Sequence, residues 1–397
     1  MKKADRMNRL GTETAFAVGA QAAAWAAKGN KVYPFHLGDM NIITPKNIRD
    51  AATQAMNDGK TGYCPNAGIP QLREELARDV GARRDIEYQM ENVAVQPGGK
   101  PVIGKFLNVV LNPGEEALYP NPGYPIYESM IEFLGGIAKP YAYRETDDGF
   151  ALDMEQLESS ITDKTTVLVY NNYQNPMGAE SSNEEMEYLA ELAVKHDLWV
   201  LSDEAYYEIR YSGKSQSIAK FPGMKERTVI LYTFGKKFAM TGWRLGAAVG
   251  PEEIITDIAK INTNDESCSN HFNQYAAIEA LTGDQSGPRQ ILQTLKARRD
   301  VAVKGLNAIE GIHCHTPETT FYLFPNVTNA MQNLGYDNLA DFQNDALEET
   351  GVSFCTRNHF GRALPGETRK YIRLAYSGID ADEIEEGLAN LKDLIEE

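Results

Sequence analysis

The middle of the chain alternates short apolar runs with segments of helical periodicity, and this alternation limits the fold more than any other feature of the sequence. The apolar runs are VLVY (167–170), LWVLSD (198–203), TVILYTF (228–234) and GAAVG (246–250). A helical pattern near residues 182–195 separates the first two runs. Uninterrupted apolar strands that alternate with helices are typical of a parallel sheet buried on both faces. We therefore expect an α/β fold with a mainly parallel central sheet flanked by helices.

The pattern changes after about residue 285. A long charged helical segment (288–309) is followed by FYLF (321–324), VSF (352–354) and YIRLAY (371–376), and then by an acidic helix. This order favours a smaller α+β domain. Near the other end of the chain, the Ala-rich segment 14–28 predicts a helix that stops at Gly29-Asn30. We predict three regions: an N-terminal arm and helix that pack with the small domain (1–45), a large domain (46–285) and a small C-terminal domain (286–397).

Charge and cysteine usage exclude some classes of partner and compartment. The chain has a formal net charge of −17. Nucleic acids and anionic membranes need a basic surface, so neither is expected as the main partner. The four cysteines, Cys64, Cys268, Cys314 and Cys355, form no CxxC pair, which indicates buried thiols in a reducing compartment. Because we recognise no signal peptide and no membrane span, we expect a cytoplasmic protein.

Polar stretches follow several of the predicted strands, and three of them have both a structural and a functional interpretation. Gly98 and Gly99 precede a helical pattern, so they could close backbone N–H groups around a phosphate or simply form a tight turn. Asn175 stands before a proline in a turn sequence, but it could also bond a ligand oxygen. Asp203 ends an apolar strand, with Tyr206 three residues later. A buried carboxylate there needs a cation such as a protonated ring nitrogen, although a helix N-cap is the commoner role.

The fourth stretch, TFGKKFAMTGWR (233–244), contains two adjacent lysines. Lys236 comes directly after a strand, where burial can lower the pKa of a lysine and make its amine nucleophilic. Thr233 and Arg244 could hold a phosphate. Lys237 begins the next segment, and only one of the two lysines can project into a cleft at the strand ends. We expect the other to be a surface charge or a neighbour of the phosphate.

The order of these features, together with four longer segments, resembles the fold-type-I pyridoxal-phosphate enzymes, specifically the class I aminotransferases of the aspartate and aromatic group. The segments are KTGYCPNAGIPQLREELA (60–77), PNPGYPIYESMIEFLGG (120–136), KFAMTGWRLG (237–246) and YIRLAYS (371–377). The resemblance covers nearly the whole chain. It implies the fold of that group, pyridoxal 5'-phosphate as cofactor, and transfer of an amino group from an L-amino acid to a 2-oxo acid by a ping-pong mechanism.

The resemblance also implies roles for individual residues of this sequence. Lys236 would hold the cofactor as a Schiff base and later move the proton, while Asp203 would keep the pyridine nitrogen protonated. Tyr206 and Asn175 would hydrogen-bond the 3-oxygen of the ring, and Tyr124 would stack on the ring face. The residues implied at the phosphate are Gly98, Gly99, Lys100, Thr233 and Arg244.

The resemblance further implies how substrate and a second subunit are bound. Arg373 would clamp the substrate α-carboxylate, with Asn175 and the backbone of Gly38 nearby. Tyr63 would reach into the site of a neighbouring chain and bind the cofactor at its phosphate, which predicts a homodimer. We also expect a cis bond between Asn175 and Pro176, because X–Pro bonds make that isomer accessible.

The substrate is less determined than the reaction. Aspartate or an aromatic amino acid is the expected donor, and 2-oxoglutarate the expected acceptor. There is no arginine between Arg244 and Arg289, a region from which some aspartate aminotransferases bind the side-chain carboxylate. Lys100, Arg144 or Arg357 would have to replace it.

Three alternatives use parts of the same pattern. A pyridoxal-phosphate-dependent carbon–sulfur β-lyase would need the same lysine, aspartate, tyrosine and arginine. A non-catalytic ligand sensor could also use this fold, although the acidic charge and the start of the fold near residue 1 speak against an attached DNA-binding domain. His313 and His315 would lie on one face of a strand, but no second ligand group stands at a standard spacing. We therefore predict no metal site.

Overall fold

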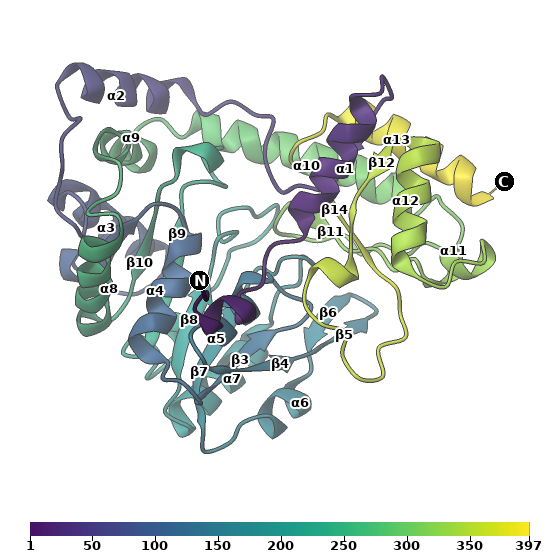
Figure 1. Cartoon of the computed structure of the whole chain (residues 1–397). Coiled ribbons are helices and arrows are strands. Elements are labelled where there is room, and N and C mark those ends of the chain that lie inside the picture. The colour runs from purple at the N-terminus through teal and green to yellow at the C-terminus, as the bar shows by residue number, and fades with distance from the viewer. Residues whose placement is uncertain (397) are drawn as a thin grey trace.

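The computed structural model describes residues 1–396, and its centre is a seven-stranded sheet (Figure 1). The strand order is β2-β10-β9-β8-β7-β3-β4. These strands are β2 (Val93–Gln96), β3 (Glu116–Pro120), β4 (Ile137–Tyr141), β7 (Thr165–Asn171), β8 (Trp199–Asp203), β9 (Thr228–Thr233) and β10 (Gly246–Val249). Only β10 runs antiparallel to its neighbours in this sheet. The expected α/β fold with a mainly parallel sheet is confirmed.

Helices cover both faces of this sheet, and β9 shows why its strands are apolar throughout. Val229 and Leu231 face a core that includes α4, α5 and α8, whereas Ile230 and Tyr232 face a core that includes α3 and α9. Since successive side chains of a strand point to opposite faces, both sets are buried, and in β9 this holds for every residue from Thr228 to Tyr232. The helices of this region are α2 (Lys46–Asn57), α3 (Pro70–Arg84), α4 (Lys100–Val110), α5 (Ile126–Phe133), α6 (Met154–Ser159), α7 (Asn183–Lys195), α8 (Glu252–Asp265) and α9 (His271–Thr282).

The C-terminal part of the chain builds a second, smaller assembly. Its three-stranded antiparallel sheet has the order β11-β14-β13, with strands β11 (Tyr322–Leu323), β13 (Cys355–Thr356) and β14 (Ile372–Ala375). Its helices are α10 (Ser286–Leu306), α11 (Thr328–Asn333), α12 (Leu339–Thr350) and α13 (Ala381–Glu396). Figure 1 shows α10 reaching from the neighbourhood of α9 toward this assembly. The division of the chain at residues 45 and 285 stays a prediction.

The N-terminal segment joins the C-terminal part. Strand β1 (Tyr33–Pro34) pairs in parallel with β12 (Val352–Ser353), and helix α1 (Ala15–Ala26) lies against β12 (Figure 1). Helix α1 matches the helix predicted at 14–28, and the chain leaves it through Gly29, whose φ of +89° favours glycine. The start of the chain therefore reaches the site from the side of the C-terminal sheet.

Short elements complete the connections. A hairpin of β5 (Tyr143–Thr146) and β6 (Gly149–Leu152) projects from the end of β4 toward the C-terminal part. The 3₁₀ segments are η1 (Asp5–Arg9), η2 (Met90–Asn92), η3 (Ile218–Lys220), η4 (Thr241–Trp243) and η5 (Arg357–His359). Among the helices in residues 1–396, none combines the length and the apolar character needed to span a membrane.

Candidate active site

A cavity of about 310 Å³ lies at the carboxyl ends of the central strands. It is closed from the other side by the N-terminal segment and by residues of β11 and β14. Of the residues predicted for the site, those that line this central cavity are Gly38, Gly99, Lys100, Tyr124, Asn175, Asp203, Tyr206, Thr233, Lys236, Arg244 and Arg373. Gly98 lies directly behind the lining, in contact with Arg244, and Tyr63 lies elsewhere.

Sheet topology explains why residues from distant parts of the sequence meet there. Strands β2, β9 and β8 end at the same edge, so Gly98, Lys236 and Asp203 follow one another in this order across the sheet. Strand β10 runs the opposite way and starts at Gly246, which pairs with the last residues of β2 and β9. Arg244 comes two residues before β10, so it lies at the same edge of the sheet as the residues that follow β2 and β9.

Lys236 has the environment of a reactive amine. Its Nζ donates a hydrogen bond of 3.1 Å to the carbonyl oxygen of Gly38 and lies 5.0 Å from the ring centre of Phe321. Burial, helped by the positive charges of Arg373 and Arg244, lowers the pKa of Lys236 to about 8. Much of this amine is therefore neutral at mildly alkaline pH, unlike an ordinary lysine.

Lys237 points into a different environment, and our expectation for it was wrong. It does not line the central cavity and is not a surface charge, because only 13% of its side chain is exposed. Its Nζ lies 3.6 Å from a carboxylate oxygen of Glu208. One residue of sequence thus separates an amine in the cavity from an amine held in a buried ion pair.

Asp203 is a buried carboxylate with no cation of its own within residues 1–396. Its Oδ2 accepts a hydrogen bond of 2.6 Å from the Tyr127 hydroxyl, and its Oδ1 accepts one of 3.2 Å from the amide of Ala205. Burial raises the pKa of Asp203. No helix begins at this point of the described chain, so the N-cap interpretation does not hold. A cationic group in the cavity would stabilise the ionised carboxylate.

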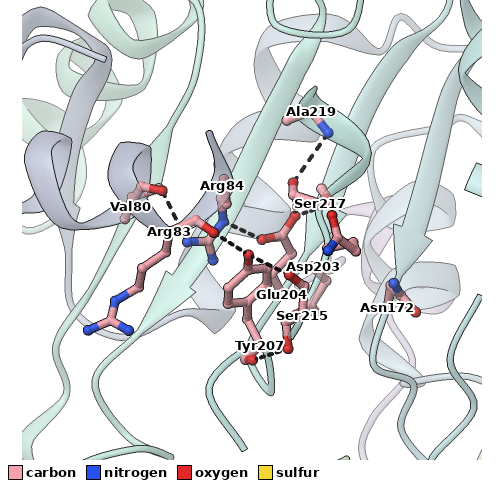
Figure 2. A network of polar contacts seen from close by, with 12 residues as sticks. Val80, Arg83, Arg84, Asn172, Asp203, Glu204, Tyr207, Ser215, Ser217 and Ala219 are labelled. Atoms are coloured by element: carbon pink, nitrogen blue, oxygen red, sulfur yellow. Dashed lines mark hydrogen bonds and ion pairs between the residues drawn. The ribbon is translucent and has the colours of Figure 1, made fainter. Parts of the chain in front are cut away.

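A second acid, Glu204, lies behind Asp203 in a network that sequence reasoning missed (Figure 2). Arg84 donates from Nε to Glu204 at 2.6 Å, and both side chains are about 1% exposed. The hydroxyls of Ser202 and Ser217 donate to the other oxygen of Glu204. The charge of Glu204 adds to the raised pKa of Asp203. The adjacent acids at 203–204 were the signal in the sequence, but nothing pointed to Arg84 as the partner.

Gly98, Gly99 and Arg244 form a cradle of the kind that binds anions. Gly98 has a φ of +109°, and a Cβ there would lie 2.5 Å from Nη2 of Arg244. Gly99 is the N-cap residue of α4, and both Gly99 and Lys100, the first residue of the helix, line the cavity, so their backbone N–H groups lie at the helix end where anions bind. The guanidinium of Arg244 is fixed by a 2.7 Å bond from Nη1 to the carbonyl of Thr241. Thr233 lies beside it on the lining.

Arg373 and Asn175 form the opposite wall of the cavity. Arg373 donates from Nη1 to Asn175 Oδ1 at 3.2 Å and from Nη2 to the carbonyl of His36 at 2.6 Å. Its Nε is buried without a hydrogen-bond partner in the described structure, and its other side-chain bonds within residues 1–396 go to Asn175, to the His36 carbonyl and to the Cys355 thiol rather than to a carboxylate. The guanidinium therefore keeps its capacity for a carboxylate ligand. The predicted cis bond at Asn175-Pro176 is present.

Two tyrosines and a glycine shape the space around Lys236. The hydroxyls of Tyr206 and Tyr322 lie 2.7 Å apart. A Cβ at Gly38 would lie 2.1 Å from the Tyr322 hydroxyl, so only glycine allows the Gly38 carbonyl to reach Lys236. The ring of Tyr124 lies on the cavity wall next to Tyr127, with ring centres 5.8 Å apart.

Glu13 is a further cavity residue that the sequence analysis did not identify. Its Oε2 accepts hydrogen bonds from Lys100 Nζ at 2.7 Å and from the Tyr124 hydroxyl at 3.1 Å. The sequence contained one indication of a special role, because Glu13 is the only acidic residue between Asp5 and Asp39. Its place in the cavity could not be predicted, because it depends on how the fold lays the N-terminal segment over the cavity.

Comparison with known proteins identifies the family. The class I and II aminotransferase family model matches residues 32–391. The chain belongs to this family. An aspartate aminotransferase of Bacillus subtilis (strain 168) is 32% identical over 399 residues, which cover 100% of this aminotransferase and 99% of that protein. A probable aspartate/prephenate aminotransferase of Aquifex aeolicus (strain VF5) is 33% identical, with 99% and 98% covered.

A solved structure gives the same result for the fold. Aspartate aminotransferase from Thermus thermophilus with maleate matches with a TM-score of 0.91 and 29% identity, covering 99% of this chain and 100% of that one. This protein is therefore a pyridoxal-phosphate-dependent aminotransferase of fold type I. The carbon–sulfur lyase alternative has no better support among these relatives.

Proposed function

We propose that this aminotransferase moves the amino group of an acidic L-amino acid, with aspartate as the leading donor, to a 2-oxo acid such as 2-oxoglutarate. One observation carries the proposal. A single cavity combines an amine of lowered pKa, a buried carboxylate that lacks a cation, an anion cradle and a buried arginine with a free donor. These are the groups needed to hold a phosphorylated cationic ring and a carboxylate side by side.

The residues of the cavity fit pyridoxal phosphate. Gly99, Thr233, Arg244 and the N-terminal end of α4 would hold its phosphate, because an anion there meets backbone N–H groups and a guanidinium. Asp203 would face the ring nitrogen and gain the cation that its burial demands. Tyr124 would contact the ring. When bound, this cofactor supplies an aldehyde that an amine can capture and a ring that takes up electrons freed at the substrate α-carbon.

We assign the proton transfer at the substrate α-carbon to Lys236. An amine with a pKa of about 8 can accept a proton near neutral pH and return it, which is the requirement for a general base that later acts as acid. Tyr206 would position the reacting groups beside Lys236, because its ring lies 5.4 Å from Nζ. Arg373, with Asn175 and Gly38 next to it, would hold the substrate α-carboxylate and so orient the α-carbon toward Lys236.

Among the three cations considered for a side-chain carboxylate, Lys100 is favoured by its position. Arg144 pairs with Asp153 at the surface, and Arg357 is buried against Glu367. Lys100 lines the cavity and already binds a carboxylate, that of Glu13. We infer that the Nζ of Lys100 binds the side-chain carboxylate of the substrate, while the backbone at Lys100 contributes to the phosphate site. The maleate bound to the Thermus thermophilus enzyme is a dicarboxylate, in keeping with such a ligand class.

The assignment of the amine is tested by comparing the two adjacent lysines. Borohydride reduction of the loaded enzyme followed by peptide mapping should place a pyridoxyl group on Lys236. Lys236→Ala should lose this adduct and the transamination activity together. Lys237→Ala is the matched control, because it removes a neighbouring lysine that lies outside the cavity. An adduct that survives in Lys236→Ala would show that the amine is assigned to the wrong residue.

The substrate class is tested with single-turnover measurements of the bound chromophore on aspartate, phenylalanine and alanine. Lys100→Gln should raise the apparent Kd for aspartate in the half-reaction by about 10-fold or more, the usual loss for a charge-assisted hydrogen bond, and should change that for alanine little. An equal loss for alanine, or faster turnover with phenylalanine than with aspartate, would contradict the acidic class. Pyruvate released from cystathionine without an oxo acid would instead favour the lyase.

We also propose a homodimer in the cytoplasm. Tyr63 supports the dimer, because 87% of this large aromatic residue is exposed and it lies outside the central cavity of its own chain. An aromatic side chain with that exposure is suited to burial against a second chain. The four cysteines are free thiols, which fits a reducing compartment.

A further inference from the structure

We propose that Glu145, His313 and His315 form a binding site for a divalent transition-metal ion of the zinc type. The three residues lie outside the central cavity, where the β5–β6 hairpin meets the segment that leads to β11. Only the two histidines could be recognised as ligand candidates from the sequence. Folding brings a carboxylate from a distant part of the chain next to them, and this is the third ligand that the spacing could not reveal.

The donor atoms have the separation that such an ion requires. One ligand atom from each residue lies within 4.8 Å of the other two. Nε2 of His315 and Oε1 of Glu145 are 3.3 Å apart. Two donors about 2.0–2.1 Å from a tetrahedral zinc ion stand roughly 3.3–3.4 Å apart, so this pair already has the spacing of neighbouring ligands. The imidazole rings of His313 and His315 lie with their centres 4.5 Å apart.

The backbone holds the two histidines on one side. His313 and Asn326 form an antiparallel bridge, with hydrogen bonds of 3.0 and 2.8 Å in the two directions. Cys314, between the histidines, is buried in the hydrophobic core. Residues two apart in an extended segment share a face. The anchored segment therefore presents both imidazoles toward the hairpin.

His315 has a nitrogen that needs a partner. Its Nε2 is buried and has no hydrogen-bond partner among the described residues, although Glu145 lies close by. A buried polar atom without a partner costs free energy, and most such atoms in folded proteins are satisfied. A metal ion between Nε2 and Oε1 would satisfy both atoms.

Glu145 is oriented as a ligand. Its Oε2 accepts hydrogen bonds from Asn326 Nδ2 at 3.1 Å, from the Tyr371 hydroxyl at 2.9 Å and from Arg369. Three donors on one oxygen fix the carboxylate and leave Oε1 directed at His315, as outer hydrogen bonds do at metal sites. The guanidinium of Arg369 lies on the far oxygen, and the Arg369 side chain is 56% exposed, so solvent screens its charge.

The test uses the holoenzyme after treatment with a chelator. Titration with Zn²⁺ against a chromogenic chelator should give one bound ion per chain, and bound Co²⁺ should give visible d–d absorption. His315→Asn and Glu145→Gln should each weaken binding by about 10-fold or more. His313→Asn should do the same, and because His313 is exposed this variant should fold normally. Zn²⁺ should raise the Tm of the parent enzyme but not that of His315→Asn.

Two controls separate this site from others. His196→Asn removes an exposed histidine at the end of α7 and should leave binding unchanged. A Cys64→Ser/Cys268→Ser double variant should also keep the ion, whereas loss of binding in that variant would assign it to thiols. Failure of the parent enzyme to bind Zn²⁺, or unchanged affinity in all three ligand variants, would overturn the proposal. Each outcome is independent of transamination.

Discussion

Lys236 and Lys237 differ by one position in the sequence and by their entire physical surroundings. The pattern of an apolar strand followed by a polar stretch predicted that only one of them enters the cleft, and it favoured Lys236. What the sequence could not show was the partner of Lys237, because Glu208 faces it only after the chain has turned. The same holds for Glu13 and Lys100, whose contact depends on the path of the N-terminal segment.

The lowered pKa of Lys236 predicts how the cofactor-free enzyme responds to pH. Only the neutral amine attacks an aldehyde, so the rate of recombination with pyridoxal phosphate should rise with pH and level off above about pH 8. A lysine with the ordinary pKa of 10.5 would still be accelerating at that point. Stopped-flow absorbance measures the rate. A profile that keeps rising toward pH 10.5 would show that the amine is not desolvated as described.

At the level of elements, the position of the site follows from strand order. Parallel strands predicted that the polar stretches share one edge, and this prediction was correct for β2, β7, β8 and β9. The reversed direction of β10 was not predicted, because GAAVG carries no signal of direction. It matters, since a parallel β10 would carry Arg244 to the opposite edge of the sheet.

A substitution at Gly98 tests whether the cradle between β2 and α4 binds the phosphate of the cofactor. Gly98→Ala would place a Cβ 2.5 Å from the Arg244 guanidinium on a left-handed backbone. We expect the affinity for pyridoxal phosphate to fall by about 10-fold or more, because the guanidinium must move. Gly29→Ala is the matched control, since Gly29 also has a positive φ but no atom within 4 Å of the added carbon. Equal affinities of the two variants in an equilibrium dialysis would contradict the cradle.

The buried ion pair between Arg84 of α3 and Glu204, just after β8, predicts how substitutions change the stability of the protein. Arg84→Met leaves Glu204 buried without its cation, so the free energy of unfolding should fall by about 3–5 kcal/mol. Arg84→Met combined with Glu204→Gln should recover part of this loss, because no buried charge remains. Arg78→Met, which breaks an exposed pair with Glu75, should change the free energy of unfolding much less, because solvent screens that pair. Urea unfolding of the three variants measures these free energies. Similar losses of stability in Arg78→Met and Arg84→Met would contradict the stabilising role of the buried network.

At the scale of the whole molecule, the order of motifs along the chain predicted the fold, the family and the residues that meet in the cavity. It did not predict contacts between distant segments that no motif records. Glu145 and His315 are an example, because each lies in a segment with its own local explanation. The homodimer also stays a prediction, since our argument for it rests on the exposed side chain of Tyr63.

Mixing of inactive variants tests whether Tyr63 acts across subunits. Tyr63→Ala and Lys236→Ala should each have little activity as pure dimers. If Tyr63 serves the neighbouring chain, a hybrid dimer regains one intact site, and random mixing restores about one quarter of the parent activity. If Tyr63 served its own chain, no hybrid would be active. The two variants are dissociated reversibly, mixed in equal amounts and allowed to reassociate, and the transamination activity of the mixture is then assayed.

The parallel pairing of β1 with β12, and the hydrogen bond from Arg373 to the His36 carbonyl, join the first and last parts of the polypeptide at one place. During synthesis on the ribosome, Lys236 and Asp203 emerge long before Arg373. All seven strands of the central sheet have been made once the chain reaches Val249, whereas the cavity still lacks Tyr322 and Arg373. A chain released before Arg373 is made would keep the reactive amine but lack the clamp for the substrate carboxylate.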